Sequence, residues 1–285
     1  MFETYVTVFV FLFGISIGSF LNVVILRLPK KQSLVSPPSH CPRCNYGLRW
    51  YDNVPILSYI TLGGKCRKCR KPISIQYPLI ELLTGVLALA CYAHFDLTPA
   101  MFVYFIFCAI LLTITFIDIP YQIIPNEISL PGILIGIGAS FFIPELRWQD
   151  SLIGAIIGFL LIFLVAYGYW FLTKREGIGM GDAKLLALLG AFLGWQAIPF
   201  LLLGSSLQGL AVFFIGYAFG LIKKQPPLPD PDEEQESATN GEKEGEEELS
   251  VRHAAIPFGP FLALSGLEFL FFGKIILDFM TGWGF

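Results

Sequence analysis

Long apolar runs recur along this chain of 285 residues, and they constrain its fold more than any other feature. The first run, Thr4–Leu26, contains no charged residue. A helix of about 20 apolar residues is long enough to cross the hydrocarbon core of a bilayer. The composition agrees, because a chain with 55% hydrophobic and 14% charged residues is too apolar for a water-soluble domain. The sequence therefore predicts an all-α polytopic membrane protein embedded in a lipid bilayer.

The apolar runs predict about eight transmembrane helices. We place them at Thr4–Leu26, Leu79–Phe95, Ala100–Ile117, Ile128–Phe142, Ser151–Leu172, two helices within Leu185–Ile222 that turn near Gly204–Ser206, and one that begins at about Ile256. The first run is expected to remain as a helix, because no small-residue cleavage site of a signal peptide follows it.

The segment between the first two predicted helices, residues 27–78, is strongly basic. It holds ten of the nineteen Lys and Arg residues and a single acidic residue, Asp52. Because loops rich in Lys and Arg stay in the cytoplasm, we expect this segment inside and the N-terminus outside. Alternating crossings then put Asp118 and Asp182 on the cytoplasmic side. The chain is accordingly divided into a first helix at 1–26, a cytoplasmic domain at 27–78 and a transmembrane domain at 79–285.

Residues 226–250 form an acidic block with ten Asp and Glu residues, one Lys and four prolines. Such a composition cannot bury enough apolar surface to fold. We therefore expect a disordered cytoplasmic loop at 225–251, with a partner-binding role as the open alternative. Since the charges are segregated into blocks, the net charge of −3 says little. No basic stripe with interleaved aromatic residues indicates nucleic-acid binding.

Two C-x-x-C pairs lie in the basic segment, Cys41 with Cys44 and Cys66 with Cys69. Two such pairs can supply four thiolates to a tetrahedral Zn²⁺, as in a zinc ribbon. Two disulfides or a thioredoxin-like redox pair are the alternatives; a cytoplasmic location disfavours the first, and no βαβ pattern accompanies the second. A site closed by four cysteines has no position open to substrate, so the predicted zinc is structural.

Two lone aspartates stand at the ends of apolar runs. Asp118 is followed by prolines that disfavour a continuing helix, which would leave the carboxylate within reach of water. Asp182 follows a glycine-rich loop and begins the next helix, where a simple N-cap is the competing interpretation. If the two acids meet, one protonated and one ionised carboxylate can share a water molecule, which is the chemistry of an aspartic protease. A nucleotide-binding interpretation of the glycine loop fails, because no βαβ unit surrounds it.

These motifs resemble those of the type IV prepilin peptidases, membrane aspartic peptidases of the GxGD type. The matching residues are Gly18–Asn22 with Arg27 and Pro29, the two C-x-x-C pairs, Asp52–Pro55, Tyr77–Glu81, Phe116–Pro125, Gly179–Lys184 and Ile256–Pro260. The family often carries further acids two and eight residues after the first catalytic aspartate, where this chain has Pro120 and Asn126. Asp118 is therefore the acid that must act.

The resemblance implies an endopeptidase that removes the basic leader of prepilins or pseudopilins just before their hydrophobic helix. It makes Asp118 and Asp182 catalytic and gives supporting roles to Gly179, Gly181 and Lys184. Members with this cysteine-bearing segment also N-methylate the new terminus with S-adenosylmethionine.

For that methyl donor the sequence offers no binding site. Asn22 and Glu81 are candidates only because they are polar and flank the zinc segment. The implied location is the bacterial inner membrane. The alternative function is a membrane transporter or a secretion-system scaffold with a structural zinc domain, whose intramembrane acids would lie near the bilayer midplane.

Overall fold

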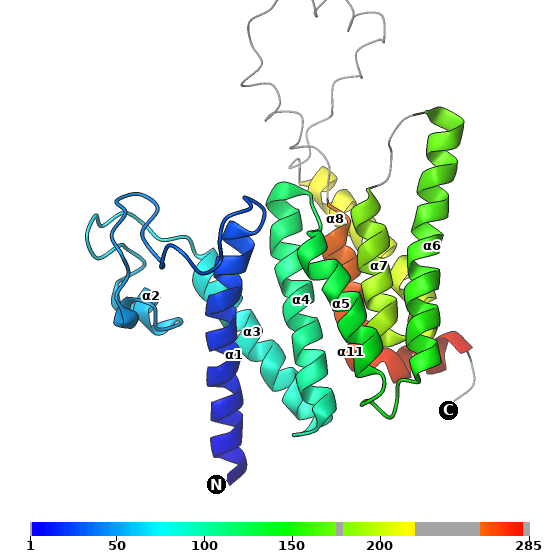
Figure 1. Ribbon diagram of the computed structural model, residues 1–285, viewed down its shortest axis with the longest axis horizontal. Helices are drawn as coiled ribbons and strands as arrows, with labels where there is room; N and C mark the ends of the chain where they lie inside the picture. Colours follow the sequence, from blue (N-terminus) through cyan, green and yellow to red (C-terminus); the bar gives the residue numbers. More distant parts are fainter. Residues whose placement is uncertain (1, 175–178, 220–256, 282–285) are drawn as a thin grey trace, which may run out of the picture.

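The computed structural model describes residues 2–174, 179–219 and 257–281, and Figure 1 follows them along the chain. The long helices are α1 Phe2–Arg27, α3 Gln76–Phe95, α4 Pro99–Tyr121, α5 Asn126–Ala139, α6 Trp148–Thr173, α7 Met180–Leu193, α8 Ile198–Ala218 and α11 Gly259–Thr281. The short ones are η1 Trp50–Asp52, α2 Leu57–Thr61 and η2 Trp195–Ala197. No β-strand occurs among the described residues, which confirms the all-α class. The predicted acidic loop at 225–251 lies outside them.

Six of these helices, α1, α3, α4, α6, α8 and α11, are long and apolar enough to cross a membrane. The remaining two long helices, α5 and α7, have 14 residues each. At 1.5 Å per residue they extend about 21 Å, which is shorter than a hydrocarbon core of about 30 Å. The predicted count of eight spanning helices is thus slightly too high, although all eight apolar segments are helical.

The prediction of a turn near Gly204–Ser206 is wrong. The chain instead turns at Gly194, which follows α7 with a φ of +81°, and at η2, while Gly204–Ser206 lie inside α8. Ser205 fits a membrane helix because its hydroxyl donates to the Leu202 carbonyl at 3.1 Å. Small residues at this point serve helix packing, since a Cβ at Gly204 would lie 2.9 Å from Ser265 Oγ on α11.

The end of α4 also differs from expectation. The helix continues through Asp118 and Pro120 to Tyr121, and Gln122 closes it with a left-handed conformation and an N–H donated to the Asp118 carbonyl at 2.9 Å. Pro120 has no N–H to donate to the Phe116 carbonyl, so it weakens the last turn, and the helix ends one residue later. Asp118 therefore lies in the last helical turn and is only 5% exposed, rather than open to water as expected.

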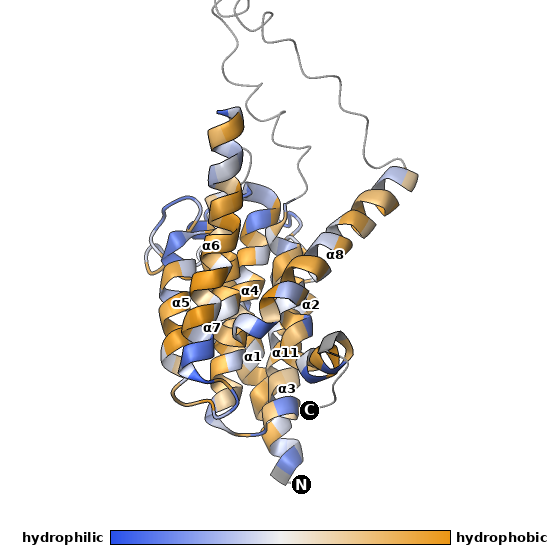
Figure 2. Cartoon of the chain, turned by 90° about the vertical axis from the view of Figure 1, so that its right-hand side faces the viewer, coloured by the Kyte–Doolittle hydropathy of each residue, from blue (hydrophilic) through white to orange (hydrophobic). Residues whose placement is uncertain are grey.

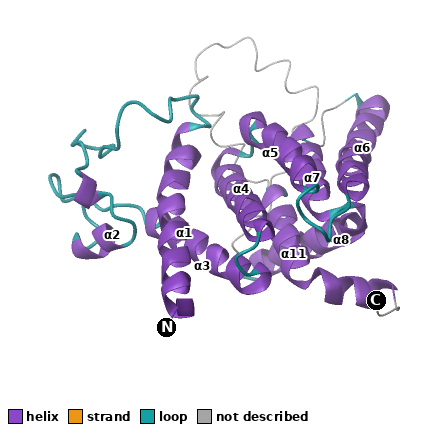
Figure 3. Ribbon diagram, turned by 60° about the horizontal axis from the view of Figure 1, so that its bottom comes forward, coloured by secondary structure: helices purple, strands orange, loops and turns teal. Residues whose placement is uncertain are grey.

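Glycines bring α1 and α3 into close contact. A Cβ at Gly18 would lie 2.7 Å from the Glu81 Cα, and one at Gly14 would lie 2.8 Å from the Ala88 Cβ. Such small-residue contacts let membrane helices approach closely. The far end of α1 and the start of α3 pack on the last turns of α4 through the cluster that contains Ile117. The cysteine-bearing segment, which follows α1, lies beside this helix pair (Figure 3).

The α6–α7 contact is tighter still. Gly154 and Gly190 face each other so closely that a Cβ on either would overlap the backbone of the other. Ser151 adds a hydrogen bond from its hydroxyl to the Ala191 carbonyl at 2.6 Å. The residues of α7 from Leu185 to Phe192 are buried. The position of α7, and of the residues in its first turn, is therefore set by packing on several sides.

In contrast, α8 leans away from the other helices toward its C-terminal end (Figure 2). It packs mainly on α11, where Gln208 Nε2 donates to Glu268 Oε2 at 2.8 Å. A hydrogen bond between two polar side chains is a common way to join helices in a membrane. Beyond Ser205 most residues of α8 are exposed.

Candidate active site and metal centre

Asp118 is one of the few buried acids among the described residues. Its carboxylate accepts a hydrogen bond from the backbone N–H of Gly259, the first residue of α11. A Cβ at Gly259 would lie 2.5 Å from Asp118 Oδ2, so no other residue fits there without displacement. The start of α11 therefore contacts the carboxylate directly through its backbone.

Asp182 is the third residue of α7 and is partly buried. The N-cap of this helix is Gly179, so Asp182 does not act as the cap. Its carboxylate lies close enough to that of Asp118 for the two charges to interact. The structure thus brings together the two aspartates that the sequence singled out, from the end of α4 and the start of α7.

Ile124 fills the space between the glycines of the site. A Cβ at Gly181 would lie 3.2 Å from the Ile124 Cβ, and one at Gly259 would lie 3.6 Å from the Ile124 Cδ1. The loop between α4 and α5 therefore packs against the starts of both α7 and α11. Sequence reasoning gave no role to Ile124 or Gly259, although both lie in motifs that carried the family resemblance.

Lys184 does not contact the aspartate pair through any hydrogen bond of the described residues. Its ammonium group donates to Asn126 Oδ1 at 2.6 Å, which links α7 to the first residue of α5. Gly179 is exposed and precedes α7, whereas Gly177 and Ile178 of the predicted loop lie outside the described residues.

The four cysteines of the basic segment converge. Their Sγ atoms all lie within 4.8 Å of one another, with 3.9 Å from Cys41 to Cys69 and from Cys44 to Cys66. A tetrahedral Zn²⁺ with Zn–S bonds of about 2.3 Å requires sulfur atoms about 3.8 Å apart. All four cysteines are free, so the disulfide alternative is not realised. The donor set and its spacing fit a zinc ion.

Both C-x-x-C pairs adopt the same local turn. The N–H of Cys41 donates to the Tyr46 carbonyl, and that of Cys66 donates to the Lys71 carbonyl, each at 2.9 Å. The residue after each pair, Asn45 or Arg70, has a positive φ. Each turn is flanked by an isolated antiparallel bridge. The repeated geometry is that of two zinc knuckles facing each other.

An ion pair connects the second knuckle to η1. Arg67 Nη2 and Nε lie 2.7 and 2.8 Å from Asp52 Oδ1, and the Asp52 side chain is fully buried. Hydrogen bonding to Asp52 raises the pKa of the Arg67 guanidinium above its usual value. A charge-assisted pair in this geometry is stronger than a neutral hydrogen bond.

Polar contacts hold α1, α3 and the cysteine-bearing segment together. Asn22 Nδ2 on α1 donates to the carbonyl of Tyr77, at the start of α3, at 3.0 Å. Glu81 Oε2 on α3 accepts the Ile56 N–H at 2.7 Å, and its carboxylate also accepts the Ser19 hydroxyl. These polar groups therefore have structural partners of their own.

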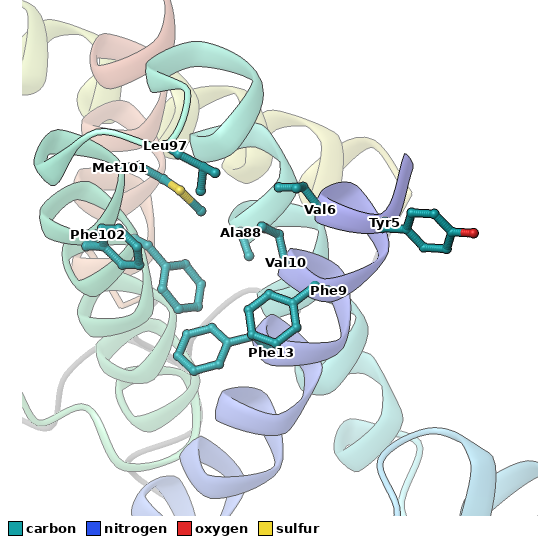
Figure 4. A pocket seen from close by; sticks show the side chains of 10 residues that line it. Tyr5, Val6, Phe9, Val10, Phe13, Ala88, Leu97, Met101 and Phe102 are labelled. Carbon is teal, nitrogen blue, oxygen red and sulfur yellow. The ribbon is translucent and has the colours of Figure 1, made fainter. Parts of the chain in front are cut away.

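A pocket of about 360 Å³ lies between α1 and the start of α4 (Figure 4). Its lining is apolar apart from Tyr5, whose hydroxyl points away from the other side chains (Figure 4). Phe102, in its wall, precedes Asp118 by 16 residues, or about 24 Å along the helix. This pocket is therefore remote from the aspartate pair.

Comparison with known proteins matches two family models to the chain. The Bacterial Peptidase A24 N-terminal domain matches residues 12–95, and the Type IV leader peptidase family matches residues 105–214. The chain is 38% identical to a prepilin leader peptidase/N-methyltransferase of Myxococcus xanthus, over 93% of this chain and 90% of the relative. It is 35% identical to proteins of the same name from Burkholderia pseudomallei, over 93% and 85%, and Pseudomonas aeruginosa, over 93% and 90%. No solved structure matches. This chain therefore belongs to the type IV leader peptidase family.

Proposed function

We propose that Asp118 and Asp182 are the catalytic pair of an endopeptidase that removes the leader from prepilins or pseudopilins. The observation that carries this proposal is the convergence of the last turn of α4, the first turn of α7 and the start of α11, which Ile124 and Gly259 pack together beside the two acids. Membership of the leader peptidase family supplies the reaction, and the relatives' shared name supplies the substrate class. The alternative of a transporter is disfavoured because Asp118 lies in the last turn of α4 rather than at its middle.

The two carboxylates work as one unit that shares a proton. The ionised member takes a proton from the attacking water, while the protonated member donates to the scissile carbonyl oxygen. Burial favours both proton transfers, because electrostatic interactions are stronger where water is excluded. Gly181 and Gly259 let the starts of α7 and α11 pack closely at the pair, because a Cβ at Gly259 would meet Asp118 and one at Gly181 would meet Ile124.

The location of the pair suits a substrate that lies in the bilayer. Asp118 is in the last turn of α4 and Asp182 is in the first turn of α7, so both acids lie at helix ends. The pair would then lie at the membrane boundary on the cytoplasmic side, with the N-terminus of α1 outside, as the basic segment indicates. A transmembrane substrate whose leader emerges at this boundary would present its scissile bond there. The protein is accordingly a multi-pass protein of the inner membrane.

The second activity is N-methylation of the new pilin terminus, for which S-adenosylmethionine would supply the methyl group. The support is the N-methyltransferase name that the relatives carry. We propose that Cys41, Cys44, Cys66 and Cys69 bind a structural Zn²⁺, which would hold the two knuckles together and take no part in either reaction.

The test is prepilin cleavage by the purified protein in detergent or vesicles. Asp118→Asn and Asp182→Asn should each lower the cleavage rate by about 10²–10⁴-fold, the usual contribution of an acid–base group. The matched control is Asp96→Asn, an exposed aspartate that follows α3. It should cleave at the wild-type rate. Normal cleavage by either of the first two variants would remove that residue from the catalytic pair.

A further inference from the structure

A groove of about 320 Å³ runs between α8 and the start of α11, the region where α8 leans away from the bundle (Figure 2). Its lining consists of Ser206, Gly209, Leu210, Phe213, Phe258 and Phe261. Five of these six residues are leucine, phenylalanine or glycine, the sixth is a serine, and none carries a charge.

The groove begins next to the aspartate pair. Phe258, in its wall, is the chain neighbour of Gly259, whose N–H donates to Asp118. Consecutive Cα atoms are about 3.8 Å apart, so the wall of the groove starts one residue from the group that contacts the carboxylate. A chain held at the pair would therefore reach the groove within its first few residues on that side.

The apolar lining of the groove favours the segment of the substrate that follows the scissile bond over the segment that precedes it. A basic leader would lose hydration in a groove that offers it no carboxylate or other anionic group. Apolar side chains instead gain about 25 cal/mol for each Å² that they bury. In the substrate class that the family resemblance implies, the part that follows the scissile bond is apolar and the part that precedes it is basic.

We propose that this groove binds the first apolar side chains that follow the scissile bond of the prepilin. The inference rests on the proposed leader cleavage, and it makes Gly209 a determinant of the size of the side chains that fit. A Cβ at Gly209 would lie 3.6 Å from the Phe261 Cδ2, an ordinary contact. Alanine therefore fits at this position, and a larger side chain projects into the groove.

Gly209→Leu should lower kcat/KM for prepilin by at least about tenfold, and Gly209→Ala should have a smaller effect. Leu207→Phe is the matched control, because Leu207 lies on the same helix, is 66% exposed and does not line the groove. It should match the wild type. Wild-type kcat/KM in Gly209→Leu would overturn the proposal.

A size-exchange experiment separates occupancy of the groove from a general loss of folding. A second prepilin carries alanine in place of the first large apolar residues after the scissile bond. Gly209→Leu should lose less activity, relative to the wild type, on this substrate than on the normal one, since the two changes act at the same place. Equal losses on both substrates would contradict the inference.

Photocross-linking tests the same contact without relying on cleavage. A photoreactive phenylalanine analogue at Phe213 is irradiated with a synthetic prepilin peptide that contains the leader and the start of the apolar helix. Adducts should map to residues just after the scissile bond. Adducts confined to the leader, to lipid, to a second copy or to residues 220–256 of this chain would overturn the inference. Absence of prepilin cleavage by the wild type would instead refute the proposed function, whatever the adducts show.

Discussion

The Asp118 carboxylate is contacted by the backbone of a glycine, Gly259. Gly259 donates its N–H to the carboxylate, and the site of its absent Cβ is only 2.5 Å from Asp118 Oδ2. Ile124 packs against Gly259, and it also packs against Gly181 at the start of α7. The backbone at the start of α11 therefore contacts the carboxylate, and Ile124 packs next to this contact.

Gly259→Ala should therefore lower the rate of prepilin cleavage by about 10²-fold or more, because the added methyl group displaces the carboxylate from its position. Gly138→Ala on α5 is the matched control, since a Cβ there would meet nothing within 4 Å. The measurement is initial cleavage rate at equal amounts of folded protein. Full activity in Gly259→Ala would show that Asp118 does not need this close contact.

The two aspartates could be found from the sequence because acids at the ends of apolar runs are rare and conspicuous. Gly259 and Ile124 could not, since their importance arises from a close approach between segments far apart in the chain. The exposure of Asp118 was also misjudged: Pro120 indicated an earlier helix end, whereas the last turn of α4 tolerates it.

At the scale of helices, the pair depends on how α7 is held. Gly154 of α6 and Gly190 of α7 approach so closely that neither position admits a Cβ, and Ser151 hydrogen bonds across the same contact. The Gly204–Ser206 turn was wrongly predicted for a related reason. Small residues can break a helix or allow helices to approach, and the sequence does not distinguish these uses until the partner helix is known.

Gly154→Ala should destabilise the protein by about 1–3 kcal/mol, the usual effect of overpacking a tight contact. Thermal unfolding in detergent measures it. Gly168→Ala, also on α6, has open space around the added methyl group and should leave the unfolding temperature unchanged or slightly higher. An equal response of the two variants would argue against the tight α6–α7 contact.

Across the whole molecule, the helix bundle and the cysteine-bearing segment are joined by a few polar contacts. Asn22 on α1 donates to the Tyr77 carbonyl at the start of α3, and Glu81 on α3 accepts the Ile56 N–H of the cysteine-bearing segment. The apolar runs and the C-x-x-C spacing made the all-α class and the cysteine cluster predictable. These connecting contacts were not predictable, because the partner of each polar group is selected by the tertiary fold.

The purified protein should contain one Zn²⁺ per chain, measured by elemental analysis. Cys41→Ser and Cys66→Ser should each lower the zinc content sharply, because each removes one of four thiolates. Cys91→Ser is the matched control, since Cys91 is buried in α3 and its sulfur lies 3.8 Å from Cys108 rather than in the cluster. Zinc-free wild-type protein with normal stability would refute the proposed metal centre.

The dependence of Asp118 on Gly259 has a consequence for biosynthesis. α4 and α7 precede Gly259 in the chain, while Gly259 opens α11, so a ribosome makes both aspartates well before it makes the residue that encloses the first. A nascent chain that has inserted only its earlier helices would then be an inert precursor. Proteolytic competence would arise only when the final helix enters the membrane and docks.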